Sequence, residues 1–283
     1  MQHPKTVLIT GASTGIGRTC ALRLERAGWQ VFAGVRKAED AEALKAAGSE
    51  KLIPVMIDVT KAETIAEAKA SIHEHVGDVG LGALVNNAGI AMPGPLEFIE
   101  PDELAWQLNV NVVGQVAVTQ QFLPMLRETK GRVVMMSSIS GELAVPVLGP
   151  YSASKFALEA ITDSLRVEVS KFDIDVIAVQ PGQIKTPIWD KGKARAKTME
   201  EQYPKEAFEL YGEFIELAVK TAHDGAKNGA DPNLVADAVL DALTSRKPKT
   251  RYAVGKGAKA AKFLAKWMPD RTRDKLLGYR FKG

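Results

Sequence analysis

Residues 7–17 decide the fold, and they read Val-Leu-Ile-Thr-Gly-Ala-Ser-Thr-Gly-Ile-Gly. The first three residues are typical of a buried strand, and the segment from Arg18 to Ala27 has helical character that ends at Gly28. The glycines between strand and helix lack a β-carbon, so this backbone can approach a pyrophosphate, and the helix amino end offers unpaired N–H groups. A Gly-rich turn can also be a simple tight connection, but its place as the first strand-turn-helix favours phosphate binding.

The pattern beyond this stretch alternates strands with helices. Strands are predicted at 30–36, 52–57, 83–85, 132–136, 174–179 and 251–254, and helical patterns at 38–47, 61–76, 101–128, 150–171, 207–222 and 232–245. Parallel neighbours require crossover connections, so this alternation predicts an α/β fold with a doubly wound parallel sheet (a Rossmann fold) in a single domain. Residues 183–231 interrupt the alternation of strands and helices, and they are predicted to form a substrate lid over the carboxyl ends of the strands. Residues 255–283 form a basic tail.

The charge of the chain is unevenly distributed. The formal net charge is +3, but from Arg246 to the end 13 Lys/Arg stand against two acids, so the tail carries +11 and the remainder −8. Apolar pairs at 263–264, 267–268 and 276–277 lie among these bases, an arrangement compatible with an interfacial helix on anionic lipid. The alternative, which we favour, is a solvated helix that packs its apolar stripe against the lid. Nucleic-acid binding is not expected, because no nucleic-acid motif accompanies the charge.

The single cysteine, Cys20, lies in a predicted helix and is best interpreted as a small core residue. One cysteine excludes an intrachain disulfide, which indicates a reducing compartment. No signal peptide and no apolar run of about 18 residues is recognised. We therefore expect a cytoplasmic location. His73 and His75 point to different faces of a helix, so no metal site is predicted.

A tyrosine and a lysine stand four residues apart at the start of a predicted helix, Tyr151 and Lys155. Residues at this spacing share a helix face, so the ammonium can lie near the phenol and favour its phenolate. Tyr151 then exchanges a proton with an alcohol or carbonyl oxygen. Ser138, after the strand at 132–136, is predicted to hydrogen-bond and polarise that same oxygen. Without further motifs, a solvated helix face would be the better interpretation of the pair.

The motifs taken in order resemble the short-chain dehydrogenase/reductase family over nearly the whole chain. They are the turn at 10–17, Asn86-Asn87-Ala88-Gly89, Asn111, Ser138, Tyr151-x-x-x-Lys155 and Pro181-Gly182. The resemblance implies a hydride-transfer enzyme, with catalytic residues Asn111, Ser138, Tyr151 and Lys155, in which Asn111 holds a helix backbone open around a water that relays protons to Lys155. Together with the turn, and with the cations Arg36 and Lys37 at the end of the second strand, it gives a predicted cofactor site of Gly11, Ser13, Thr14, Gly15, Ile16, Gly17, Arg36, Lys37, Asp58, Val59, Asn87, Ala88, Gly89, Tyr151, Lys155, Pro181, Gly182, Ile184 and Thr186. Within this set, residues 58–59 and 87–89 serve the adenosine half and 181–186 the nicotinamide.

The choice of nicotinamide cofactor depends on the end of the second strand. A carboxylate there accepts hydrogen bonds from a ribose 2′-hydroxyl, whereas a guanidinium accommodates a 2′-phosphate. Gly34 and Val35 supply no carboxylate, and Arg36 and Lys37 supply two cations, so NADP(H) is expected. Glu39 and Asp40, on the next helix, keep NAD(H) as the alternative.

The predicted reaction interconverts an alcohol and a ketone or aldehyde. An apolar substrate is expected from the side chains between Ser138 and Tyr151 and from the lid, although these residues can also simply pack the lid; they are Leu143, Val145, Val147, Ile188 and Trp189. The family resemblance also implies a homodimer or homotetramer through the helices at 101–128 and 150–171. Two other interpretations stay open: a dinucleotide-binding redox module without turnover, disfavoured by the complete proton-transfer set, and a sugar-nucleotide epimerase, disfavoured by the short carboxyl-terminal region.

Overall fold

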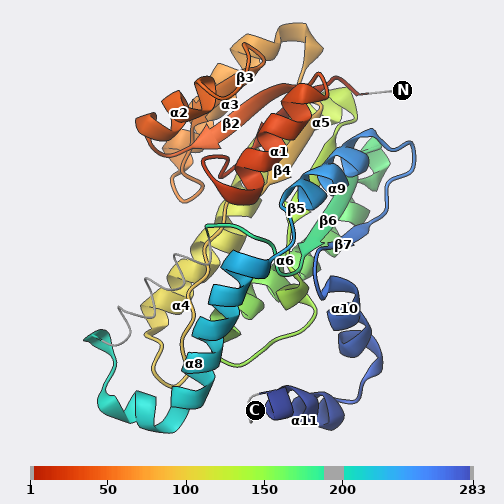
Figure 1. The fold of residues 1–283 in the computed structure, drawn as a ribbon. Coiled ribbons are helices and arrows are strands. Elements are labelled where there is room, and N and C mark those ends of the chain that lie inside the picture. The colour runs from red at the N-terminus through yellow and green to blue at the C-terminus, as the bar shows by residue number, and fades with distance from the viewer. Residues whose placement is uncertain (1–2, 188–200, 281–283) are drawn as a thin grey trace.

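A seven-stranded parallel sheet forms the centre of the protein (Figure 1), in the strand order β3-β2-β1-β4-β5-β6-β7. The structure is a computed structural model that describes residues 3–187 and 201–280, with side chains described up to residue 276 in the last helix. The strands are β1 (Thr6–Ile9), β2 (Gln30–Val35), β3 (Leu52–Met56), β4 (Ala83–Asn86), β5 (Arg132–Met136), β6 (Asp175–Pro181) and β7 (Arg251–Val254). The seven predicted strands are confirmed, with ends that shift by one or two residues.

The helices follow the strands along the chain, as the crossover connections of a parallel sheet require. They are α1 (Gly15–Arg26), α2 (Ala38–Lys45), α3 (Ala62–Val76), α4 (Pro101–Leu108), α5 (Gly114–Thr129), α6 (Gly149–Glu168), α8 (Lys205–Asn228), α9 (Asn233–Thr244), α10 (Ala258–Trp267) and α11 (Asp270–Arg280). A five-residue π-helical segment, η2 (Asn109–Val113), joins α4 to α5, and short 3₁₀ turns occupy η1 (Gly77–Val79), η3 (Ile139–Gly141) and η4 (Ser170–Phe172).

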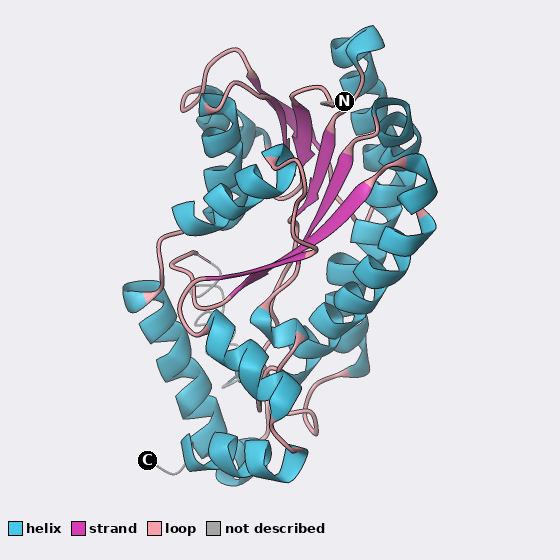
Figure 2. Cartoon of the chain, turned by 90° about the vertical axis from the view of Figure 1, so that its right-hand side faces the viewer, coloured by secondary structure: helices cyan, strands magenta, loops and turns pink. Residues whose placement is uncertain are grey.

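The sheet is buried on both faces, and its strands supply alternate side chains to two hydrophobic cores. In β1, Val7 and Ile9 belong to the core that α1 and α9 cover, whereas Leu8 belongs to the core beneath α3 and α5. This alternation follows from the two-residue period of a strand. Figure 2 shows the resulting three layers, with helices on either side of the twisted sheet. The doubly wound α/β architecture predicted from the sequence is confirmed.

The chain reverses its direction of travel across the sheet at β1. This strand pairs with β2 on one side and with β4 on the other, so the connections on its two sides run in opposite directions. Open α/β sheets bind their ligands at such a switch point, outside the carboxyl ends of the strands. The Gly-rich turn at 10–17 begins at that end of β1.

The segment from 183 to 231 contributes one long helix, α8, which extends the predicted pattern at 207–222 in both directions. Residues 188–200 of this segment lie outside the described residues. Helices α8, α10 and α11 lie at the lower end of the molecule in Figure 1, away from the N-terminus. Among the described residues, no helix combines the length and apolar character that a membrane span requires.

Candidate active site

The turn between β1 and α1 has a conformation that depends on its glycines. Gly11 and Gly15 have φ angles of +64° and +56°, in the left-handed region that side chains disfavour. A β-carbon on Gly17 would lie 2.3 Å from the Gly11 carbonyl oxygen. Thr14, at the N-cap of α1, makes no side-chain hydrogen bond to the helix, and the first turn carries no acidic residue. The donors and charge of this helix end therefore fit a pyrophosphate.

Asn87 and Ala88, which directly follow the neighbouring strand β4, are hydrogen-bonded to this turn. The Thr10 hydroxyl accepts hydrogen bonds from the backbone N–H groups of Asn87 and Ala88, both at 3.0 Å. In return, the Asn87 amide donates to the carbonyl oxygens of Thr10 (2.9 Å) and Gly11 (3.0 Å). Four hydrogen bonds thus join the predicted adenosine-side segment to the start of the predicted phosphate turn.

The loop after β6 reaches the same turn from the other side. A β-carbon on Gly15 would lie 3.4 Å from the Thr186 β-carbon, so Thr186 is in van der Waals reach of the turn. Gly182 donates its N–H to the Val254 carbonyl at 2.7 Å, and Ile184 is buried. The structure therefore brings the predicted nicotinamide segment, 181–186, against the phosphate turn. Ile188 and Trp189 lie outside the described residues.

Ser138, Tyr151 and Lys155 meet beyond the carboxyl end of β5. Ser138 lies close enough to the Tyr151 phenol to favour its ionised form. The Lys155 Nζ lies 5.7 Å from the centre of the Tyr151 ring and donates to the Met136 carbonyl oxygen at 2.8 Å. Ser138 and Lys155 are buried and Tyr151 is half-buried. This is the geometry that proton exchange with a substrate oxygen requires.

The ionisation of this pair differs from the sequence-based expectation. Burial raises the pKa of Tyr151 above its ordinary value, and the neighbouring Ser138 side chain opposes that rise. The expected net lowering of the phenol pKa is therefore wrong for this structure, because burial outweighs the groups that favour the phenolate. Burial also lowers the pKa of Lys155 to about 8, against the opposing charge of Glu159.

Asn111 lies in the π-helical segment and links the site to the loop after β4. Its side-chain amide donates to the Ile90 carbonyl at 2.9 Å, and its oxygen accepts from the Ile90 N–H at 2.8 Å. The amide also donates to the Ser154 hydroxyl at 3.0 Å, and that hydroxyl donates to the Tyr151 carbonyl at 2.7 Å. A π turn widens the helix where Asn111 sits, as the predicted opening of the backbone requires.

Three buried polar residues of this frame were not predicted: Gln107, Gln115 and Ser154. Gln107 holds the loop after β4 through the Ile90 carbonyl and the Met92 N–H, both at 2.8 Å. Gln115 donates to the Ala88 carbonyl at 2.9 Å. The sequence carries a signal for the two glutamines, because they precede and follow Asn111 by four residues.

Arg36 and Lys37 are exposed just beyond the carboxyl end of β2. Asp58, beyond the end of β3, accepts hydrogen bonds from the Thr60 N–H (3.0 Å) and hydroxyl (2.7 Å). Partial burial raises the pKa of Asp58, but those hydrogen bonds and the charge of Arg36 outweigh it, so the net pKa is lowered. Val59 packs against Gly114 of α5, where a β-carbon would lie 2.8 Å from its side chain. The structure thus groups Arg36 with Asp58 and directs Val59 into the core.

The loop between Ser138 and Tyr151 carries the predicted substrate-facing side chains. Leu143 and Val145 are half-buried, and Val147 is buried. Val147 has a φ angle of +66°, which is rare for a β-branched residue, and its carbonyl accepts a hydrogen bond from the Gly94 N–H at 2.8 Å. Such strain costs on the order of 1–3 kcal/mol and concentrates at functional sites.

The remaining candidate groups contribute no chemistry to the described site. Burial raises the pKa of the Cys20 thiol to about 12, so this cysteine behaves as a core residue. Within 3–187 and 201–280, no group of three or more His, Cys, Asp or Glu side chains is arranged to hold a metal ion.

Comparison with known proteins gives one consistent family. A family model described as short chain dehydrogenase matches residues 5–197. The NADPH-dependent 3-dehydrocapnine reductase of Ornithobacterium rhinotracheale is 36% identical over 277 residues, which cover 95% of this chain and 94% of that protein. The 17-beta-hydroxysteroid dehydrogenase type 6 of Homo sapiens is 37% identical and covers 96% of this chain and 87% of its own.

A solved structure extends the likeness to the whole fold. The crystal structure of a short chain dehydrogenase from Burkholderia cenocepacia in complex with NADP has a TM-score of 0.72 and 26% identity, with both chains fully covered. The family model spans more than half of the chain, and the two relatives exceed 30% identity over nearly all of it. The chain therefore belongs to the short-chain dehydrogenase/reductase family, whose members are NAD(P)-dependent oxidoreductases that act on CH–OH groups.

Proposed function

We propose that this oxidoreductase uses NADP(H) to interconvert an apolar alcohol and its ketone or aldehyde. The observation that carries the proposal is the grouping of Ser138, Tyr151 and Lys155 beyond the end of β5. The Lys155 Nζ lies 5.7 Å from the centre of the phenol ring and donates to the Met136 carbonyl at 2.8 Å. The same end of the sheet carries the glycine turn that fits a pyrophosphate. The cofactor would supply or accept the hydride. The chain itself positions the substrate oxygen and moves its proton.

The roles of the three side chains follow from their contacts. In the reductive direction, the Tyr151 hydroxyl donates its proton to the developing alkoxide, and Ser138 stabilises the same oxygen by a hydrogen bond. The buried ammonium of Lys155 favours the phenolate that remains. In the oxidative direction, the proton returns from the alcohol to Tyr151. Residues of the glycine turn would hold the diphosphate, and Asn87 keeps that turn in place.

The preference for NADP(H) is supported by Arg36 and Lys37, which are exposed where a 2′-phosphate would lie, and by the relatives whose names include NADPH or NADP. Replacing Arg36 with alanine should raise the KM for NADPH roughly 10- to 100-fold, because a hydrogen bond to a charged group contributes about 1.5–3 kcal/mol. Rates with NADH should change little. The exposed Arg26, at the far end of α1, gives a matched control. A wild-type preference for NADH would refute the assignment.

An apolar substrate is supported by Leu143, Val145 and Val147 beside Tyr151, and by relatives named for a dehydrocapnine and a hydroxysteroid. A panel of steroid, retinoid, fatty and aromatic carbonyls, with simple sugars as polar members, tests the proposal through loss of NADPH absorbance. We expect turnover of apolar members and none of the sugars. A panel in which only polar carbonyls react would contradict the substrate class.

The proposal has four further parts, which concern the location of the enzyme, its oligomeric state, its lid and its contact with membranes. A cytoplasmic location is supported by the single, buried Cys20. A homodimer or homotetramer is supported by the exposed apolar side chains Trp106 and Phe156 on α4 and α6. The segment at 183–231 would act as the lid. Contact of the basic tail with anionic lipid, the less favoured interpretation of the sequence, is supported by Phe263 and Trp267, which are 63% and 68% exposed on α10.

A further inference from the structure

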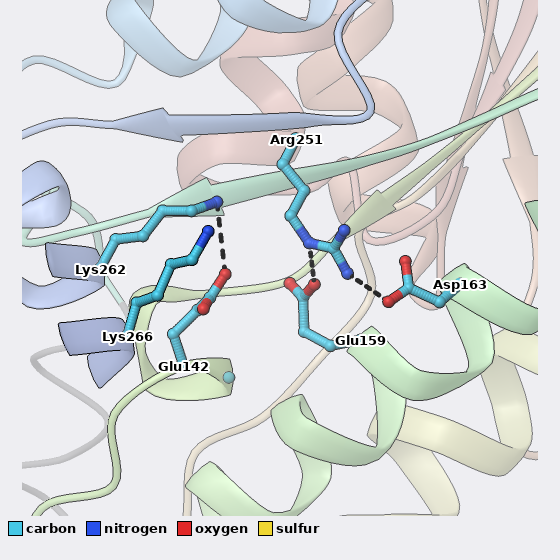
Figure 3. A pocket seen from close by; sticks show the side chains of 7 residues that line it. Glu142, Glu159, Asp163, Arg251, Lys262 and Lys266 are labelled. Atoms are coloured by element: carbon cyan, nitrogen blue, oxygen red, sulfur yellow. Dashed lines mark hydrogen bonds and ion pairs between the residues drawn. The ribbon is translucent and has the colours of Figure 1, made fainter. Parts of the chain in front are cut away.

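A charged cavity lies on the side of α6 that faces β7 and α10. Its volume is about 380 Å³, and neither Ser138 nor Tyr151 lines it. Figure 3 shows Arg251 of β7 pointing between two carboxylates of α6, while two lysines of α10 approach a third carboxylate. The charged groups that line it are Glu142, Glu159, Asp163, Arg251, Lys262 and Lys266.

One of these groups, Glu159, adjoins the catalytic lysine. Glu159 follows Lys155 by four residues on α6, so the two side chains share a helix face. Both are buried, with exposed fractions of 8% and 4%. The turn after Ser138 closes over this face, because a β-carbon on Gly141 would lie 3.0 Å from both the Glu159 Cγ and the Lys155 carbonyl. Glu159 and Lys155 are therefore buried neighbours on one face of α6, beneath the turn at Gly141.

Glu159 is held in place from two strands. Its Oε1 accepts a hydrogen bond from the Gln180 amide of β6 at 2.9 Å, and its Oε2 accepts from the Arg251 Nε of β7 at 2.9 Å. Buried carboxylates are stable only when their lone pairs are satisfied in this way. Both oxygens of Glu159 have a protein donor, so its position is fixed.

The other charged groups around Glu159 are partly paired with one another. Glu142 accepts from the Gln180 amide at 2.7 Å and lies 3.4 Å from the Lys262 Nζ. Arg251 also binds Asp163, at 2.7 Å, and Lys266 lines the outer part of the cavity. Of these groups, Glu159 is the one within a helical turn of Lys155, and its charge raises the pKa that burial lowers.

We propose that Glu159 is a positioning residue for catalysis: its fixed, buried carboxylate keeps Lys155 in the ammonium form beside Tyr151. The inference rests on the proposed function, because it assigns a purpose to a charge on Lys155. A buried lysine without a nearby anion loses its proton readily. Glu159 supplies that anion without entering the substrate side of the site. Arg251 and Gln180, which donate hydrogen bonds to its carboxylate, moderate the effect of its charge on Lys155.

The ionisation of Lys155 can be followed directly, with no substrate or cofactor. Protein labelled with ¹³C at the lysine Cε is titrated by NMR, and the Lys155 signal is identified by its loss in Lys155→Met. In Glu159→Gln we expect the midpoint to fall by roughly half to one pH unit, because an opposite charge has been removed. Asp163→Asn is the matched control, since it also removes a partner of Arg251 but lies two turns from Lys155; its midpoint should not move.

A second variant gives the opposite sign. Arg251→Gln removes the cation that offsets Glu159, so the Lys155 midpoint should rise. A residue with a merely structural role would not move the midpoint in opposite directions in the two variants. An unchanged midpoint in Glu159→Gln, or a fall in Arg251→Gln, would overturn the inference. An enzyme that turns over no carbonyl would instead refute the proposed function and leave these titrations as they are.

Discussion

Turnover by the Tyr151→Phe variant is expected to fall roughly 100- to 10,000-fold, the usual contribution of a positioned general acid or base. The substitution removes the phenol hydroxyl near Ser138 that would exchange the proton, and it keeps the ring beside which Lys155 lies. Binding of NADPH should remain nearly unchanged, because the glycine turn and its support by Asn87 do not depend on the phenol oxygen. The measurements are steady-state rates with a reactive carbonyl and a fluorescence titration with NADPH.

Tyr252→Phe provides the control for loss of a partly buried phenol. Its hydroxyl donates to the Asp241 carboxylate at 2.7 Å, near the far end of α9, and no predicted site residue takes part. Stability should drop slightly, by about 1 kcal/mol, with full turnover retained. Equal rates for wild type and Tyr151→Phe would show that another group transfers the proton.

Lys155→Met is expected to change how stability depends on pH. The pKa of Lys155 is about 8 in the folded protein, below its ordinary value of 10.5. Between these values the unfolded chain binds more protons than the native state, so the native state gains stability as pH rises. The cost of the buried charge is fully present below the folded pKa. Relative to Lys155→Met, the wild type should gain roughly 2 kcal/mol between about pH 7 and about pH 10.

Urea unfolding of both proteins at the two pH values measures this difference. The Met136 carbonyl loses its partner in the variant at every pH, so that loss cancels from the comparison. Lys262→Met, a half-buried lysine of α10, is the control, and its stability should track the wild type. A constant gap between wild type and Lys155→Met would mean that Lys155 keeps its proton in the folded protein up to about pH 10, so that burial does not lower its pKa.

The sequence predicts the sheet well because the decisive signals are local. The strand-turn-helix at 7–17 and the regular return of apolar runs specify parallel strands with crossover helices, and the structure has them. The predicted groups at 10–17, 87–89 and 181–186 lie together in the structure because all three stand at the carboxyl ends of strands. Parallel pairing alone places these carboxyl ends on the same side of the sheet.

The parts that escaped prediction depend on contacts across the fold. The side chain of Asn111, in the π turn, pairs with the backbone of Ile90, a contact that a helical sequence pattern does not reveal. The raised pKa of Tyr151 follows from its burial, and spacing alone cannot show how deep a side chain lies. The same holds for Glu159, whose importance appears only when Arg251, 92 residues away, is seen to bind it.

Strand β7 also has a consequence for biosynthesis. All four predicted catalytic residues are translated before residue 156, but Arg251, the partner of Glu159, is made almost a hundred residues later. Pairing of β7 with β6, in which Ala178 faces Arg251, must wait until that part of the chain has left the ribosome. A nascent chain therefore carries Lys155 and Glu159 for some time before Arg251 is available to bind Glu159.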